Sequence, residues 1–105
     1  MNIYISGKIS GDPKFKEKFK NAFYFILENK EKLFPDHTNN FSLFNPANVD
    51  LPENSTWEDY MRYDIKILTD CNAIYMLKDW QESEGAKLEH QIAKKLKMKI
   101  IYETE

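Results

Sequence analysis

The chain has 105 residues and a mass of 12.5 kDa, with 42% hydrophobic and 30% charged residues, as expected for one globular domain covering residues 1–105. Its formal net charge of −2 excludes the strong positive field of a dedicated duplex-DNA-binding protein. One cysteine and two histidines exclude an internal disulfide framework and argue against a structural zinc site.

No apolar run approaches the roughly 20 residues that cross a bilayer, and the N-terminal segment lacks the pattern of a secretory signal. We therefore expect a cytoplasmic protein without a membrane or duplex nucleic acid as partner.

The first half of the chain predicts two strands and one long helix. Residues 2–6 form a β-rich run. Asp12 and Pro13 fit the N-cap and the first position of a helix that ends near Lys32. Its apolar stripe consists of Phe15, Phe19, Phe23, Ile26 and Leu27. Residues 41–45 form the second predicted strand.

The second half predicts two more strands, each preceded by a helix. Residues 46–54 contain two prolines and form a loop. The sequence from Ser55 to Glu58 matches a capping box and begins a helix that runs to about Asp70. The remaining elements are a strand at 72–77, a loop at 78–82, a helix at 83–97 and a strand at 99–102.

This alternation of strands and helices predicts an α/β fold. It indicates a four-stranded, mainly parallel sheet with helices on both faces, a three-layer sandwich. In such folds, ligands bind outside the carboxyl ends of the strands, near the point where the strand order reverses.

Two carboxylates interrupt the predicted apolar stripes. Asp64 lies within the stripe formed by Trp57, Met61, Ile65 and Leu68. Glu89 extends backward the stripe formed by Ile92, Ala93 and Leu96, and Gly85 lies one turn before it. An unpaired buried carboxylate costs several kcal/mol, so the pair indicates a functional site. The alternative is that both are ordinary acids at the edges of the stripes.

Several polar and aromatic residues follow the predicted strands and are candidates for ligand binding. Ser83 begins a helix, where its hydroxyl and the free N–H groups favour an anion, although a simple N-cap is the alternative. The turn Gly7, Lys8, Ile9, Ser10 and Gly11 could bind a phosphate through its backbone N–H groups.

Two aromatic side chains add to these candidates. The phenol of Tyr4, in the first strand, needs a partner if buried, and a carboxylate above the strand ends is a plausible one. The alternative is a simple core tyrosine. Trp80, in the loop after the third strand, could stack on a planar ligand or cover its own core.

Three segments together resemble a known group of proteins: residues 3–7 (Ile-Tyr-Ile-Ser-Gly), residues 60–64 (Tyr-Met-Arg-Tyr-Asp) and residues 80–90. They look like a small, often phage-borne family that is similar to the nucleoside 2-deoxyribosyltransferases and the deoxynucleoside 5′-monophosphate N-glycosidases. The resemblance covers nearly the whole chain. It implies a flavodoxin-like sheet and cleavage or transfer at the N-glycosidic bond of a deoxynucleoside or its monophosphate.

The resemblance also implies residue roles. Glu89 matches the glutamate that attacks the anomeric carbon, Tyr4 the tyrosine that positions it, and Asp64 an aspartate near the leaving base. Ser83 matches a base-binding aspartate of the transferases or a phosphate-binding serine of the hydrolases. Ser10 stands where the hydrolases have an arginine. No metal or organic cofactor is required.

The sequence departs from these relatives in two ways. Glu89 is followed by His-Gln rather than Gly-Tyr or Gly-Arg, and the polar segment that completes the relatives' site from a neighbouring subunit has no counterpart. The site is therefore incomplete or completed by the 46–56 loop. The resemblance implies a homodimer or higher oligomer. The alternative to an enzyme is a nucleotide-binding module that retains the pocket without the chemistry, or an interaction protein.

Overall fold

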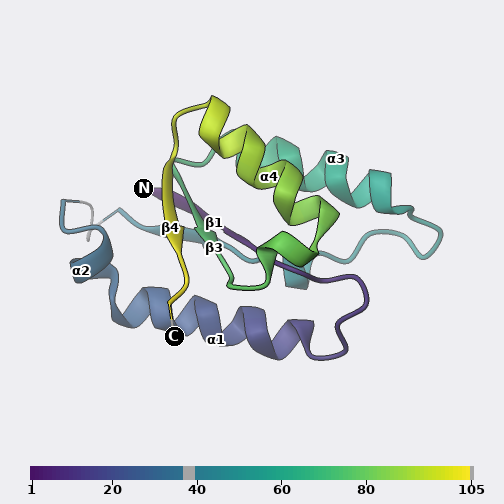
Figure 1. The fold of residues 1–105 in the computed structure, drawn as a ribbon, viewed down its shortest axis with the longest axis horizontal. Helices are drawn as coiled ribbons and strands as arrows, with labels where there is room; N and C mark the ends of the chain where they lie inside the picture. The colour runs from purple at the N-terminus through teal and green to yellow at the C-terminus, as the bar shows by residue number, and fades with distance from the viewer. Residues whose placement is uncertain (37–39, 105) are drawn as a thin grey trace.

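The structure, a computed structural model, describes residues 1–36 and 40–104 and shows a parallel sheet between two layers of helices (Figure 1). The strands are β1 (Asn2–Ser6), β2 (Ser42–Phe44), β3 (Ala73–Met76) and β4 (Lys99–Tyr102). The helices are α1 (Phe15–Glu28), α2 (Lys30–Leu33), α3 (Trp57–Leu68) and α4 (Glu84–Lys95), with 3₁₀ turns η1 (Pro46–Asn48) and η2 (Trp80–Glu82).

The sheet has the strand order β2-β1-β3-β4, and every neighbouring pair is parallel. This arrangement confirms the predicted α/β, flavodoxin-like fold class. β1 is central, because Tyr4 pairs with Phe44 of β2 on one side and with Ile74 of β3 on the other. The strand order reverses at β1, so the carboxyl ends of β1 and β3 form the region where such folds bind ligands.

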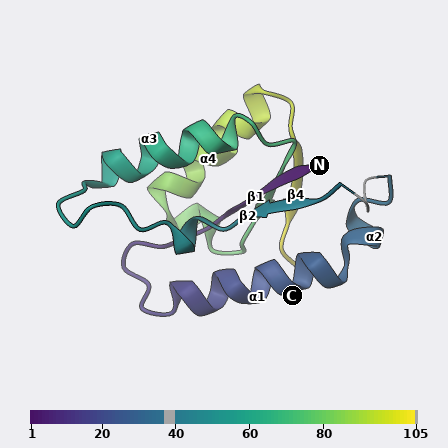
Figure 2. The same ribbon diagram turned by 180° about the vertical axis from the view of Figure 1, so that it is seen from behind.

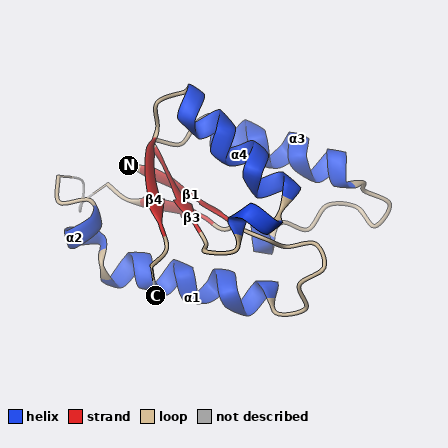
Figure 3. Cartoon of the chain, viewed as in Figure 1, coloured by secondary structure: helices blue, strands red, loops and turns tan. Residues whose placement is uncertain are grey.

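The two faces of the sheet have separate cores because side chains alternate along each strand. Ile3 and Ile5 of β1 point to the α1 face, where they pack with Phe19 and Ile26. Tyr4 points to the opposite face, toward the layer that contains α3 and α4. Figures 2 and 3 show α1 on one side of the strands and these two helices on the other.

Several helix ends differ from the sequence prediction, and the helix expected to end near Lys32 is divided at Asn29 into α1 and α2. α1 begins at Phe15 rather than Pro13, and residues 12–15 form a turn before it, in which the Asp12 carboxylate accepts the Lys14 N–H at 2.9 Å and the Asp12 carbonyl accepts the Phe15 N–H at 3.3 Å. The capping box of α3 lies one residue later than predicted, between Thr56 and Asp59, whose side chains each accept the other's backbone N–H.

The predicted last helix is also too long. α4 ends at Lys95, and Leu96 is its C-cap with 53% of its surface exposed, so Leu96 does not extend the apolar stripe. The backbone of Lys97 then adopts a positive φ of 57°, which turns the chain toward β4.

None of the helices among the described residues is long and apolar enough to span a membrane.

The position of Gly7, directly after β1, has no room for a side chain. A Cβ built there lies 2.6 Å from Leu77 Cδ1 and 2.8 Å from Leu77 Cβ, both inside the buried core. Gly11 is constrained differently, since its φ of 81° lies in the left-handed region that favours glycine. The turn after β1 therefore needs glycine at both ends for different reasons.

We predict that Gly7→Ala lowers the free energy of unfolding by about 1–3 kcal/mol, the usual cost of overpacking a core. Gly85→Ala is the matched control, because its Cβ meets the flexible Met61 Sδ at 3.1 Å and the loss should be smaller. Urea denaturation of the two variants measures the difference. An equal loss in both would contradict the packing argument.

Candidate functional site

The site begins with two hydroxyl groups on one face of β1. Tyr4 and Ser6 are two residues apart in the strand, so both side chains point to the α3 and α4 face. Both residues are fully buried, and Ser6 is the last residue of β1. The strand thus presents a phenol and an alcohol beneath the helices that cross it.

The partner of both hydroxyls is Glu89 of α4, which is buried with only 5% of its surface exposed. The Tyr4 hydroxyl donates a short hydrogen bond to Glu89 Oε2, and the Ser6 hydroxyl donates to Oε1 at 2.7 Å. The predicted pairing of Tyr4 with a buried carboxylate is therefore confirmed, and each carboxylate oxygen has its own donor.

Asp64 is the second buried acid, with 6% of its surface exposed. It lies on the buried side of α3 together with Met61 and Leu68. Its Oδ1 atom is buried and has no hydrogen-bond partner among the described residues. A buried oxygen without a hydrogen-bond partner costs free energy, so Asp64 is unlike the polar groups of an ordinary core.

Burial raises the pKa of both acids to about 7. For Glu89 the hydrogen bonds from Tyr4 and Ser6 oppose this effect, and the nearby Asp64 adds to it. The carboxylate with two donors holds negative charge better than the one with an unsatisfied oxygen. We therefore assign the single charge of the pair to Glu89 and the proton to Asp64 near neutral pH.

The phenol is held in its neutral form by the same surroundings. Burial, followed by the charge of Glu89, raises the pKa of Tyr4 well above its usual value. The Tyr4 hydroxyl also faces Asp64, but its single proton is donated to Glu89. Tyr4 therefore acts as a fixed hydrogen-bond donor to Glu89.

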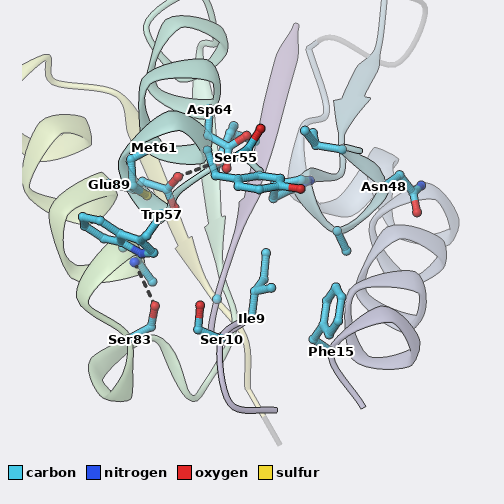
Figure 4. A pocket seen from close by; sticks show the side chains of 18 of the residues that line it. Ile9, Ser10, Phe15, Asn48, Ser55, Trp57, Met61, Asp64, Ser83 and Glu89 are labelled. Carbon is cyan, nitrogen blue, oxygen red and sulfur yellow. Dashed lines mark hydrogen bonds between the residues drawn. The ribbon is translucent and has the colours of Figure 1, made fainter. Parts of the chain in front are cut away.

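The two acids open onto a cavity of about 680 Å³ at the carboxyl end of β1 (Figure 4). Of the residues predicted for the site, eight line this cavity: Tyr4, Gly7, Ile9, Ser10, Asp64, Ser83, Gly85 and Glu89. Residues 46–50, with Ser55 and Thr56, form another wall. The loop proposed to complete the site therefore does contribute to it.

Three predicted binding residues do not line the cavity: Lys8, Gly11 and Trp80. The Lys8 ammonium points to Glu82, at 3.9 Å. The Trp80 ring instead stacks on His90, with ring centroids 4.1 Å apart, and packs against the core on the α3 and α4 face. Trp80 therefore covers its own core, which was the alternative considered for it.

A cluster of charged groups fixes the turn that connects β1 to α1. The Lys18 ammonium donates to Asp12 Oδ2 at 2.6 Å, to Asp79 by a short contact and to the Lys8 carbonyl at 2.8 Å. Asp79 in turn accepts the Lys8 N–H at 3.1 Å. The cluster joins the turn to α1 and to the loop after β3, so the cavity wall at Ile9 is held from two sides.

Ser83 is the N-cap of α4, as predicted. Its Oγ accepts the Ala86 N–H at 3.1 Å, which leaves the hydroxyl proton free to be donated to a ligand in the cavity. The first N–H groups of α4 lie beside it, so this corner of the cavity suits a polar or anionic group.

The sequence reasoning missed two features of the site. Ser6 was not recognised as a partner of Glu89, although its spacing of two from Tyr4 placed both on one strand face. Trp57 was assigned to the apolar core stripe, but it lines the cavity with 47% of its surface exposed. Its position at the first turn of α3 could have indicated an exposed end of that stripe.

In the part of the chain that the structure describes, no group of three or more His, Cys, Asp or Glu side chains is arranged to hold a metal ion.

We predict that Asp64→Asn changes the pH dependence of stability. Because burial raises the Asp64 pKa, native Asp64 keeps its proton between about pH 4 and 7 while the unfolded chain loses it, so wild-type stability falls as pH rises. Asn cannot ionise. The free energy of unfolding of Asp64→Asn, relative to that of wild type, should therefore rise by on the order of 2 kcal/mol between pH 4 and 8.

Urea denaturation at pH 4, 6 and 8 measures this effect, with Asp70→Asn, an exposed position just after α3, as the control. A stability difference between wild type and Asp64→Asn that does not change with pH would contradict the assignment.

Comparison with known sequences places the chain in a family. Residues 1–102 match a family described as a domain of unknown function, DUF4406. No curated protein matches the chain. Since the family match spans nearly the whole sequence, the chain belongs to the DUF4406 family.

Proposed function

We propose that the protein cleaves the N-glycosidic bond of a 2′-deoxynucleoside or its 5′-monophosphate, with Glu89 as the nucleophile. The observation that carries this proposal is the pair of buried acids at the cavity: Glu89 with two hydroxyl donors, and Asp64 with an unpartnered oxygen. Glycosidic cleavage uses such a pair, one ionised and one protonated. The resemblance of residues 3–7, 60–64 and 80–90 to deoxyribosyltransferases and N-glycosidases supports it.

The proposed first step uses the two acids in different ways. A carboxylate oxygen of Glu89 attacks C1′ of the sugar, forming a C–O bond as the C1′–N bond breaks. The electron pair of that bond goes to the base, which takes the proton of Asp64. Negative charge on Glu89 also stabilises the oxocarbenium-like transition state, and Tyr4 and Ser6 keep the carboxylate oriented.

The second step releases the sugar. Water, or a second base, attacks C1′ of the glycosyl-enzyme and frees the Glu89 carboxylate, while the proton of the attacking group returns to Asp64. Hydrolysis and base transfer thus share one intermediate. Ser83 and the residues of the turn after β1 that line the cavity, Gly7, Ile9 and Ser10, would hold the 5′ end of the sugar, which places C1′ against Glu89.

We predict that Glu89→Gln lowers the rate of base release by at least about a thousandfold, because the nucleophile is lost. The substrates are the four common deoxynucleosides and their 5′-monophosphates, and free base is measured by chromatography. Glu28→Gln, an exposed position on α1, is the control and should retain the wild-type rate. Circular dichroism checks that both variants fold.

Glu89→Gln turnover within about tenfold of wild type would contradict the proposed mechanism. Saturable binding of a nucleotide by the wild type without any base release would instead support the non-catalytic binding module. Sedimentation of the same samples tests the homodimer or higher oligomer that the resemblance implies.

We predict a bell-shaped dependence of kcat on pH with its maximum near pH 7, because the reaction needs Glu89 ionised and Asp64 protonated. The rate should fall at low pH as Glu89 takes a proton and at high pH as Asp64 loses one. Asp64→Asn should be slower and lack the alkaline decline. An unchanged alkaline decline in Asp64→Asn would show that another group donates the proton.

A further inference from the structure

One face of α3 leads from the buried acid to the surface. Trp57, Tyr60, Met61 and Asp64 are spaced three, four and seven residues from the first, and all four line the cavity. Burial decreases along this row, from 6% exposed at Asp64 and 8% at Met61 to 47% at Trp57. The indole therefore stands at the outer end of the cavity, two helical turns or about 10 Å along the axis from Asp64.

The two tryptophans of the chain are in different situations. Trp80 is stacked on His90 within the protein. Among the residues that the structure describes, no aromatic ring stacks on Trp57. An indole offers a large flat apolar surface with one N–H donor, and leaving half of it in water at a cavity wall favours a function in binding.

The surroundings of Trp57 leave room for a flat group. A smaller hollow of about 370 Å³ adjoins the same side chain and is lined by Ser10, Trp57, Glu82, Ser83, Glu84 and Gly85. Three of these residues have short side chains or none, so the space beside the indole is not filled. Figure 4 shows Trp57 on the same side of the cavity as Glu89 and Ser83, with Phe15 and Asn48 at the other side.

Charge also selects the kind of group that fits there. The ionisable side chains that line the cavity are Asp50, Asp64, Glu89, Lys16 and Tyr60, with the buried Tyr4. An uncharged planar ring brings no further charge near Glu89 and gains contact with the indole face. Hydrogen-bonding atoms at the edge of such a ring can reach toward Asp64, whose Oδ1 has no partner among the described residues.

We propose that Trp57 is the stacking platform for the planar base of the ligand. This inference rests on the proposed function, because it takes a nucleoside or nucleotide as the occupant of the cavity. The base enters flat against the indole with its edge toward Asp64, and the sugar lies beside Glu89. Trp57, and not the predicted Trp80, is thus the aromatic residue that contacts the substrate.

Fluorescence tests the contact directly. The Trp80→Phe variant contains a single tryptophan, so its emission reports Trp57 alone. Titration with the four deoxynucleosides and their 5′-monophosphates should give saturable quenching by at least one of them. 2-Deoxyribose 5-phosphate, which lacks a base, should give none. Calorimetry then compares Trp57→Phe, which keeps an aromatic ring, with Trp57→Leu, which keeps only apolar bulk.

We expect Trp57→Leu to weaken binding of the quenching ligand roughly 5- to 150-fold, and Trp57→Phe to stay within about threefold of wild type. Equal affinity of the two variants, or no saturable quenching by any of the eight ligands, overturns the inference. So does a change in Trp57 emission that follows protein concentration alone, which would indicate a second copy covering the indole.

These results are distinguishable from a failure of the proposed function. If Trp57→Leu binds the quenching ligand more weakly than wild type while wild type releases no base, the stacking role of Trp57 is supported and the proposed cleavage is contradicted. If wild type and Trp57→Leu release base with the same KM, the proposed cleavage is supported and the stacking role of Trp57 is contradicted.

Discussion

The hydrogen bonds between Glu89 and the two hydroxyls of β1 are the interaction on which the site depends. Glu89 is only 5% exposed, so its charged form is costly, and burial alone favours the protonated form. Two donors on one strand face offset this cost and fix both oxygens in place. Asp64, the second buried acid at the cavity, has an oxygen without a hydrogen-bond partner among the described residues. Two chemically similar acids therefore have different surroundings in the same cavity.

The fold supplies this difference through the alternation of side chains in the central strand. Ile3 and Ile5 anchor β1 to the α1 layer, while Tyr4 and Ser6 use the opposite face for polar contacts. A shift of one residue in the register of β1 would exchange the two sets and place both hydroxyls in the apolar core. Directly after Ser6, Leu77 leaves no room for a side chain at Gly7, where the chain leaves β1 and turns along the cavity.

The sequence predicted the parts of this arrangement that follow from periodicity. The strand and helix alternation gave the layers, and the interruption of two apolar stripes located Asp64 and Glu89, since a buried acid stands out against its neighbours. Helix ends were less accurate, because Ser55 and Thr56 have the same capping chemistry and because Asp12 stabilises a turn before α1. Trp80 stacks on His90 and does not line the cavity, whereas Trp57, assigned to the core stripe, does line it, since aromatic type does not tell which ring finds a partner within the fold.

The distance in sequence between the partners of Glu89 has a consequence for how the protein acquires its site. Tyr4 and Ser6 lie 85 and 83 positions before Glu89 in the chain. Contacts of such long range form only after the intervening loop has closed, and they contribute to slow folding. Neither half of the chain alone holds both the donors and the acceptor. The hydrogen-bonded arrangement of Glu89 therefore exists only in molecules in which β1 and α4 have docked.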